Sequence, residues 1–172
     1  MRSSISLRPI GPDDEAFLYR VYAGTRTEEL AVTGWDDAQK EQFLRMQFNA
    51  QHRYYQETFP DAAYQVIAWE DQLAGRLYVD RRAEEISIID IAILPDYRGR
   101  GIGSVLLAEI MAEASAARKP VRIYVERFNR ALHWYERLGF RTIGDTGVYY
   151  HMEWTPGEAT AGNASQPAAE PS

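Results

Sequence analysis

Hydrophobic positions along this chain repeat with two different periods. Continuous apolar runs, or apolar residues at every second position, are typical of β-strands, whereas apolar residues three and four positions apart are typical of amphipathic helices. The first pattern predicts strands over residues 5–8, 64–69, 75–81, 85–94, 121–125, 140–143 and 148–154. The second predicts helices over residues 12–23, 36–58, 103–118 and 129–139, with a loop or short helix at 24–34.

The order of these elements predicts an α/β (α+β) domain. Three antiparallel strands come first, a turn at 70–74 joins two of them, and the later strands are connected through helices. Residues 1–154 therefore form a single predicted domain. From 155 to 172 the chain is rich in small residues, proline and glutamate and has no aromatic residue, which predicts a disordered tail.

The composition excludes several classes of function. A chain of 172 residues can bury a core without covalent staples, and it has no cysteine for disulfides, thiolate metal sites or nucleophilic catalysis. Residues 1–7 lack the apolar core of a signal peptide, and no apolar run is long enough to span a bilayer, so we expect a cytoplasmic protein without a membrane partner. The net charge of −6 argues against nucleic-acid binding. It mildly favours a cationic substrate but is equally typical of an ordinary soluble surface.

A glycine-rich segment between a predicted strand and a predicted helix indicates a phosphate site. Residues 98–103 read Arg-Gly-Arg-Gly-Ile-Gly. Gly99, Gly101 and Gly103 would let the backbone curl closely around a ligand, and the positive end of the helix dipole favours anions. Arg98 and Arg100 add permanent charges suited to phosphate oxygens.

This segment differs from two familiar phosphate loops. No lysine follows its glycines, as a P-loop would require, and the third glycine of a dinucleotide-binding fingerprint is absent. The remaining pattern is Arg-x-x-Gly-x-Gly. The alternative interpretation is an ordinary tight turn with two solvated arginines.

A second segment, residues 129–140, reads Asn-Arg-Ala-Leu-His-Trp-Tyr-Glu-Arg-Leu-Gly-Phe. Asn129 is a favourable N-cap, and Gly139 is placed to end the helix before the next strand. Ala131 and Tyr135 share one helical face. The two segments, in this order and with this gap, resemble the GNAT superfamily of acyl-CoA-dependent N-acyltransferases.

The resemblance implies a fold and a cosubstrate. The GNAT fold is a mixed, mostly antiparallel sheet of six to seven strands with a splayed central pair, flanked by about four helices. The splayed strands would be 86–94 and 121–125, with the pantetheine arm of acetyl-CoA between them. Residues implied to bind the cosubstrate are Ile91, Ile93, Arg98, Gly99, Arg100, Gly101, Ile102, Gly103, Ser104, Asn129 and Tyr135.

Direct transfer of an acetyl group to an amine needs a proton donor for the departing thiolate, a donor to the carbonyl oxygen and a neutral amine. By resemblance, Tyr135 is the candidate donor to the thiolate and the N–H near Ile93 the donor to the oxygen; Tyr135 as a core residue is the alternative. Candidate bases are Asp90, where an apolar strand would raise the carboxyl pKa, and Glu126. Their alternatives are a structural carboxylate and a surface charge. The glutamate that some relatives carry two residues before Glu126 is replaced here by Tyr124.

The acceptor is left open by the sequence. Polar and aromatic residues that could line its pocket are Gln47, Gln51, His52, Tyr54, Tyr55, Tyr149 and Tyr150. They identify neither a small-molecule nor a peptide amine. The histidines at 52, 133 and 151 show no ligand spacing, so we assign no metal. A non-catalytic acyl-CoA-binding module is the competing function, and a homodimer is compatible with the fold.

Overall fold

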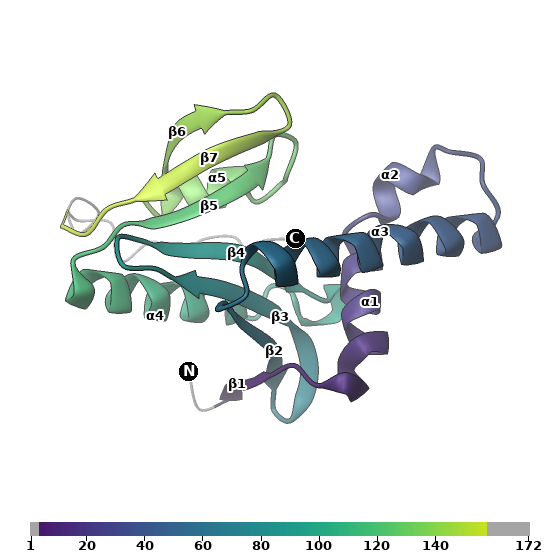
Figure 1. Ribbon diagram of the computed structural model, residues 1–172, viewed down its shortest axis with the longest axis horizontal. Helices are drawn as coiled ribbons and strands as arrows, with labels where there is room; N and C mark the ends of the chain where they lie inside the picture. Colours follow the sequence, from purple (N-terminus) through teal and green to yellow (C-terminus); the bar gives the residue numbers. More distant parts are fainter. Residues whose placement is uncertain (1–3, 158–172) are drawn as a thin grey trace.

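A seven-stranded mixed sheet forms the centre of the molecule (Figure 1). The computed structural model describes residues 4–157, so the expected tail lies outside the described residues from 158 onward. The strand order is β1-β2-β3-β4-β5-β7-β6. Bounds of the strands are β1 Ile5–Pro9, β2 Ala63–Trp69, β3 Gln72–Arg81, β4 Ile86–Ile93, β5 Val121–Glu126, β6 Arg141–Asp145 and β7 Tyr149–Trp154.

Five α-helices and two 3-10 turns accompany the sheet in the described part of the chain. The α-helices are α1 Glu15–Gly24, α2 Thr27–Ala31, α3 Asp37–Thr58, α4 Ile102–Ala117 and α5 Leu132–Arg137, and the 3-10 turns are Pro12–Asp14 and Pro95–Tyr97. The predicted mixed fold is confirmed, and the undecided segment 24–34 contains the short helix α2. Over residues 4–157, no helix combines the length and apolarity needed to cross a membrane.

Local signals explain where two of the helices begin. The Asp36 carboxylate accepts a hydrogen bond from the Gln39 N–H at 2.8 Å, and the Gln39 side chain accepts one from the Asp36 N–H, which forms the capping box that starts α3. Helix α5 departs from expectation. The Asn129 carboxamide oxygen accepts from the Ala131 N–H at 2.7 Å in a local turn, and α5 begins only at Leu132.

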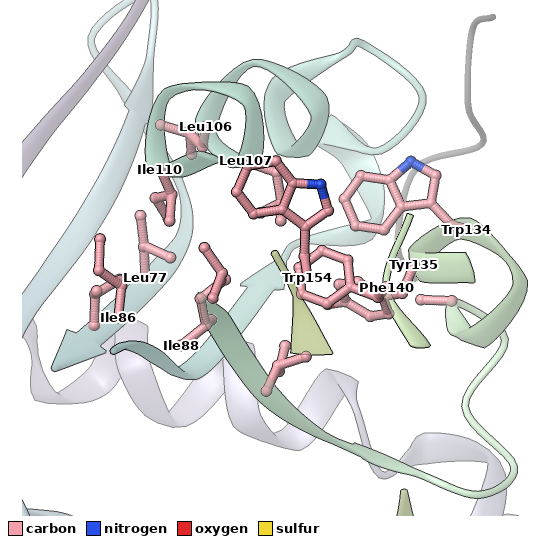
Figure 2. Packing of buried hydrophobic residues seen from close by; sticks show 14 of the residues in the cluster. Leu77, Ile86, Ile88, Leu106, Leu107, Ile110, Trp134, Tyr135, Phe140 and Trp154 are labelled. Atoms are coloured by element: carbon pink, nitrogen blue, oxygen red, sulfur yellow. The ribbon is translucent and has the colours of Figure 1, made fainter. Parts of the chain in front are cut away.

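Alternation along the strands divides the core between the two faces of the sheet. On β4, Ile91 and Ile93 pack with the cluster that includes α4 and α5, whereas Ala92 belongs to the cluster of α1 and α3. Figure 2 shows the first cluster, in which Leu106 and Leu107 of α4 lie near Trp154. The two faces are therefore covered by different helix pairs.

The central parallel pair opens partway along its length. Strands β4 and β5 are paired only from Ile86–Val121 to Ile88–Ile123, although both strands continue beyond these residues. The register between β3 and β4 also shifts here, so that Ile89 is an additional residue in β4. The predicted splay of these two strands is confirmed.

Candidate active site

The splayed strands leave a backbone edge of β4 directed towards the opening. The Leu94 N–H donates to the Ala74 carbonyl at 2.8 Å, which directs the backbone groups of Leu94 and Ala92 towards β3. Because these groups alternate along a strand, those of Ile91 and Ile93 are directed away from β3. The Ile93 carbonyl accepts a hydrogen bond from Arg98 Nε at 3.0 Å. The two residues expected to meet pantetheine therefore face the opening; their binding role stays a prediction.

The glycine loop forms a sharp turn before α4. Gly99 and Gly101 have φ values of 75° and 82°, in the left-handed region that favours glycine, and α4 starts directly after Gly101. Gly103 differs from expectation, because it lies buried in the first turn of the helix beside Ile102 and does not help the chain to curl. Ser104 follows on the same turn. The positive end of the α4 dipole thus lies at the loop.

The structure separates the two arginines of this loop. Arg98 is half-buried and lines the main cleft of the molecule. Arg100 is exposed, lies over the Trp69 ring at 4.6 Å and donates to the Asp96 carbonyl. Of the two side chains suggested for phosphate, only Arg98 is among the residues that line the cleft.

The main cleft has a volume of about 780 Å³. Its wall includes the splayed part of β4, the end of β5, the α1–α2 segment, the C-terminal half of α3 and β7. It extends from Arg98 and Asn129 at the end near the loop to Tyr55 and Tyr149, so one continuous space could hold both a cosubstrate and an acceptor. Of the predicted acceptor residues, those lining this cleft are Gln51, Tyr54, Tyr55 and Tyr149.

Other predicted side chains lie elsewhere. Gln47 accepts a hydrogen bond from the Tyr22 hydroxyl at 3.1 Å, and His52 stacks on Phe48, so neither lines the cleft. Tyr150 packs against the core. His133 is exposed and contacts Glu136. Within residues 4–157, no group of three or more His, Asp or Glu side chains is arranged to hold a metal ion.

Arg98 differs from the other arginines of the cleft wall. Within the described residues, Arg26, Arg76, Arg82 and Arg130 each form an ion pair with a carboxylate, whereas Arg98 forms none. Burial lowers the pKa of Arg98, and the neighbouring positive charge of Arg130 lowers it further. Both effects disfavour the charged guanidinium, and a bound anion would relieve both. The donor set at this end of the cleft therefore fits a phosphate group.

Asp90 has a partner that the sequence did not reveal. Its carboxylate accepts a hydrogen bond from Arg76 Nε, and Arg76, only 3% exposed, also donates to the Gln51 side chain at 3.0 Å. Burial is the largest single effect and lowers the pKa of Arg76, but the Asp90 charge, the Tyr78 and Tyr55 hydroxyls and the hydrogen bond to Asp90 together leave this pKa raised. The apolar strand around Asp90 therefore also contains a buried guanidinium that binds its carboxylate, and the role of Asp90 as a base stays a prediction.

Glu126 is also paired. Its carboxylate accepts from Arg26 Nη1 at 3.1 Å, across 100 residues of sequence, and this pair joins the end of β5 to the α1–α2 segment. A second pair, Arg130 with Glu28 at 2.6 Å, makes the same connection with the charges exchanged. Glu126 therefore forms a bridge beside the cleft, and its role as a base stays a prediction.

Tyr135 lies on the other face of the sheet, inside the core. It is 3% exposed and its ring packs against Trp134 and Phe140, with centroids 4.9 and 5.7 Å apart (Figure 2). Burial raises the pKa of its hydroxyl, and the Asp90 charge raises it further, so the phenol stays protonated. Tyr135 is therefore a core residue that keeps its proton, and it lies close enough to Asp90 for the carboxylate charge to affect its pKa. Its catalytic role stays a prediction.

Comparison with known proteins finds one family model and several solved structures that resemble this chain. Residues 60–142 match the model described as acetyltransferase (GNAT) domain. The structure resembles the PaiA N-acetyltransferase of Thermoplasma acidophilum in complex with coenzyme A, with a TM-score of 0.67, 19% identity, and 88% of this chain and 99% of that chain covered.

Two further solved structures share the fold. An acetyltransferase from Thermus thermophilus has a TM-score of 0.61 and 22% identity, with 87% of this chain and 95% of that chain covered. Naa50 of Arabidopsis thaliana, in complex with the bisubstrate analogue CoA-Ac-MVNAL, has a TM-score of 0.58 and 17% identity over 88% and 99% of the two chains. At these identities, the likeness to the solved structures concerns the fold.

Proposed function

We propose that this chain, whose residues 60–142 match the GNAT acetyltransferase domain, is a member of that family and transfers an acetyl group from acetyl-CoA directly to a primary amine of a small molecule or peptide. The observation that carries this proposal is Arg98, a cleft arginine without a carboxylate partner in the described chain, at the mouth of the splayed β4–β5 pair. A phosphate of the cosubstrate would supply the missing counter-charge. Coenzyme A is bound by the PaiA relative, which supports this choice of ligand.

The backbone in the opening suits the extended part of the cosubstrate. Ile91 and Ile93 direct their peptide groups to the side from which β5 has diverged. A pantetheine arm carries amides that could pair with such an edge in the manner of an added strand. Acetyl-CoA supplies an acetyl group activated as a thioester, and the residues around the opening orient it.

The residues proposed to act on the amine and on the thiolate lie on opposite faces of the sheet. Asp90 lies on the face covered by α3, where the Arg76–Gln51 contacts hold its carboxylate in place, and the acceptor amine approaches from this side. Tyr135 lies on the opposite face, where its protonated hydroxyl can donate to the departing sulfur. The opening between the strands connects the two groups.

The paired carboxylates define what they can do for the amine. Asp90 and Glu126 each already bind a guanidinium, so we assign them to orientation of the amine and to proton transfer through water in preference to direct removal of its proton. An amine of low pKa needs the least help: about 8 for an α-amine against about 10.4 for a lysine side chain.

A calorimetric titration with acetyl-CoA tests the binding half of this proposal. The unchanged protein should bind, and Arg98→Ala should weaken binding about tenfold to a hundredfold, since a charged hydrogen bond contributes about 1.5–3 kcal/mol. Arg53→Ala, which removes an exposed arginine away from the cleft, is the matched control. Equal affinities of the two variants would contradict the assignment of Arg98. The transfer half is tested by the release of free thiol when an amine is added.

A further inference from the structure

One side of the cleft is an aromatic wall built by the end of α3. Tyr55 packs against Phe59, the residue that ends the helix, with centroids 6.4 Å apart, and Tyr54 lies 6.0 Å from Tyr55. All three rings line the cleft. The Tyr54 side chain is well exposed, so this wall is accessible to a molecule that enters.

A second aromatic wall lies on β5 and β7. Tyr124 stacks in parallel on His151 at 4.2 Å, and its ring centroid is 6.5 Å from that of Tyr149. These residues also line the cleft. Tyr124 is the first residue of β5 beyond the part paired with β4, so the second wall begins where the strands diverge.

The two walls belong to one space, with Asp90 within electrostatic reach of both. Burial raises the pKa of Tyr55 most and the Asp90 charge raises it further; for Tyr149, burial and then the Glu126 charge raise the pKa most, with a smaller contribution from Asp90. The two phenols also act on each other electrostatically, since Tyr149 adds to the rise for Tyr55. A flat group that extends from an amine at Asp90 would therefore meet aromatic rings of both walls.

The charges of this space are already balanced. Asp90, Glu126 and Glu85 are each paired with an arginine, at Arg76, Arg26 and Arg122 respectively. Within the described chain, the remaining carboxylates of the cleft wall, Glu28 and Glu29, are paired as well. A second ammonium group would therefore have to share a carboxylate that an arginine already binds, as the reacting amine shares Asp90 with Arg76, and the unpaired cation Arg98 is the one we assign to the cosubstrate.

We propose that the acceptor site takes a primary monoamine whose carrier is a flat, uncharged apolar group, held between these two aromatic walls. Polyamines and free amino acids are disfavoured, because their additional charges find no unpaired partner beside the walls. The ammonium group itself is attracted by the Asp90 carboxylate and the tyrosine rings before it loses its proton. This inference rests on the proposed function, since it names the substrate class of that same cleft.

A panel of four amines tests the proposal by thiol release from acetyl-CoA. Phenethylamine carries the ring and one charge, phenylalanine adds a carboxylate to the same skeleton, spermidine adds further ammonium groups, and butylamine lacks the ring. The expected kcat/KM for phenethylamine is about tenfold above that of each of the others. A higher kcat/KM for spermidine or phenylalanine would overturn the proposal.

Variants of the aromatic walls test whether they cause the preference for phenethylamine. Tyr149→Leu should raise the KM for phenethylamine about fivefold to tenfold and leave that for butylamine unchanged, because a stacking surface is lost while the exposed site tolerates the change. Tyr19→Leu is the control, as Tyr19 lies outside the cleft. Equal effects of Tyr149→Leu on both amines would also overturn the proposal.

Binding measurements separate this inference from the proposed function. Phenethylamine and spermidine are titrated calorimetrically into the protein saturated with CoA, which requires no turnover. Binding of phenethylamine without any thiol release would contradict the proposed transfer and support the aromatic site. Thiol release with spermidine, together with tighter binding of spermidine, would support the transfer and overturn the aromatic site.

Discussion

Arg76 and Asp90 form a diagonal ion pair between β3 and β4, in which the guanidinium is almost completely buried and the carboxylate faces the cleft. The pair lies at the β4 bulge, where β5 begins to diverge. The pair therefore both stabilises the sheet and holds the Asp90 carboxylate in position at the proposed acceptor site.

Arg76→Met should destabilise the protein, because it leaves the Asp90 charge without its partner. We expect a loss of about 2–4 kcal/mol in the free energy of unfolding, below the full effect for a wholly buried pair because the Asp90 side chain is 25% exposed. Denaturant unfolding measures this loss. The double variant Arg76→Met/Asp90→Leu should recover part of it; a double variant less stable than Arg76→Met would contradict the role of the pair.

Tyr135→Phe should lower kcat by about a hundredfold or more while the affinity for acetyl-CoA barely changes, because the change removes one donor and keeps the ring. The contacts with Trp134 and Phe140 would remain, so thermal stability should stay close to that of the unchanged protein. Steady-state kinetics and calorimetry provide the two readouts, with Tyr19→Phe as the control. An unaltered kcat would exclude Tyr135 as the proton donor.

Gly75→Ala should disturb β4 itself. A Cβ at this position of β3 would collide with the Ala92 carbonyl oxygen and crowd the Ile93 backbone. We expect a cost of about 1–3 kcal/mol in the free energy of unfolding, and weaker acetyl-CoA binding because the Ile91–Ile93 edge moves. Gly144→Ala in β6 is the control, since its Cβ would meet only the His151 Cβ at an ordinary 3.5 Å. Equal stability of the two variants would contradict this close approach.

Acid stability should depend on Asp14. Arg8 donates two hydrogen bonds of 2.8 Å to this carboxylate and holds its pKa below the usual range, against the opposing effect of burial. The stabilisation is complete above the unfolded-state pKa of about 3.9 and is lost as the pH falls through the lower folded-state value. Asp14→Asn should therefore be less stable than the unchanged protein at pH 7. In urea unfolding series at decreasing pH, the difference in unfolding free energy between the two proteins should shrink below about pH 4. A difference that stays constant with pH would contradict the role of the Arg8–Asp14 pair.

The parts of the site that depend on local signals were predictable from the sequence. The positive φ values of Gly99 and Gly101 and the start of α4 follow from a strand, a glycine-rich loop and a helix in succession. The family resemblance of residues 98–103 and 129–140 added the two strands that diverge. These features need no knowledge of distant contacts.

The partners of the carboxylates could not be predicted in this way. Arg26 and Glu126 are 100 residues apart, and only the folded chain brings them together. The Arg76–Asp90 pair depends on a register that the β4 bulge shifts. Arg76 stands in β3 between the apolar residues Ala74 and Leu77, which was a signal that it required a partner, because charged residues are rarely buried alone. The late start of α5 reflects a similar competition, since the Asn129 side chain stabilises a turn in place of the first helical residues.

The rate of free-thiol release from acetyl-CoA tests the central claim most directly. It is measured with the unchanged protein in the presence of phenethylamine and, in parallel, N,N-dimethylphenethylamine, a tertiary amine of similar shape that cannot form a stable amide. Direct transfer predicts that the primary amine increases the rate in a saturable manner and that the tertiary amine does not. Equal rates with both amines, no higher than the rate without any amine, would contradict acetyl transfer to an aromatic primary amine in this cleft.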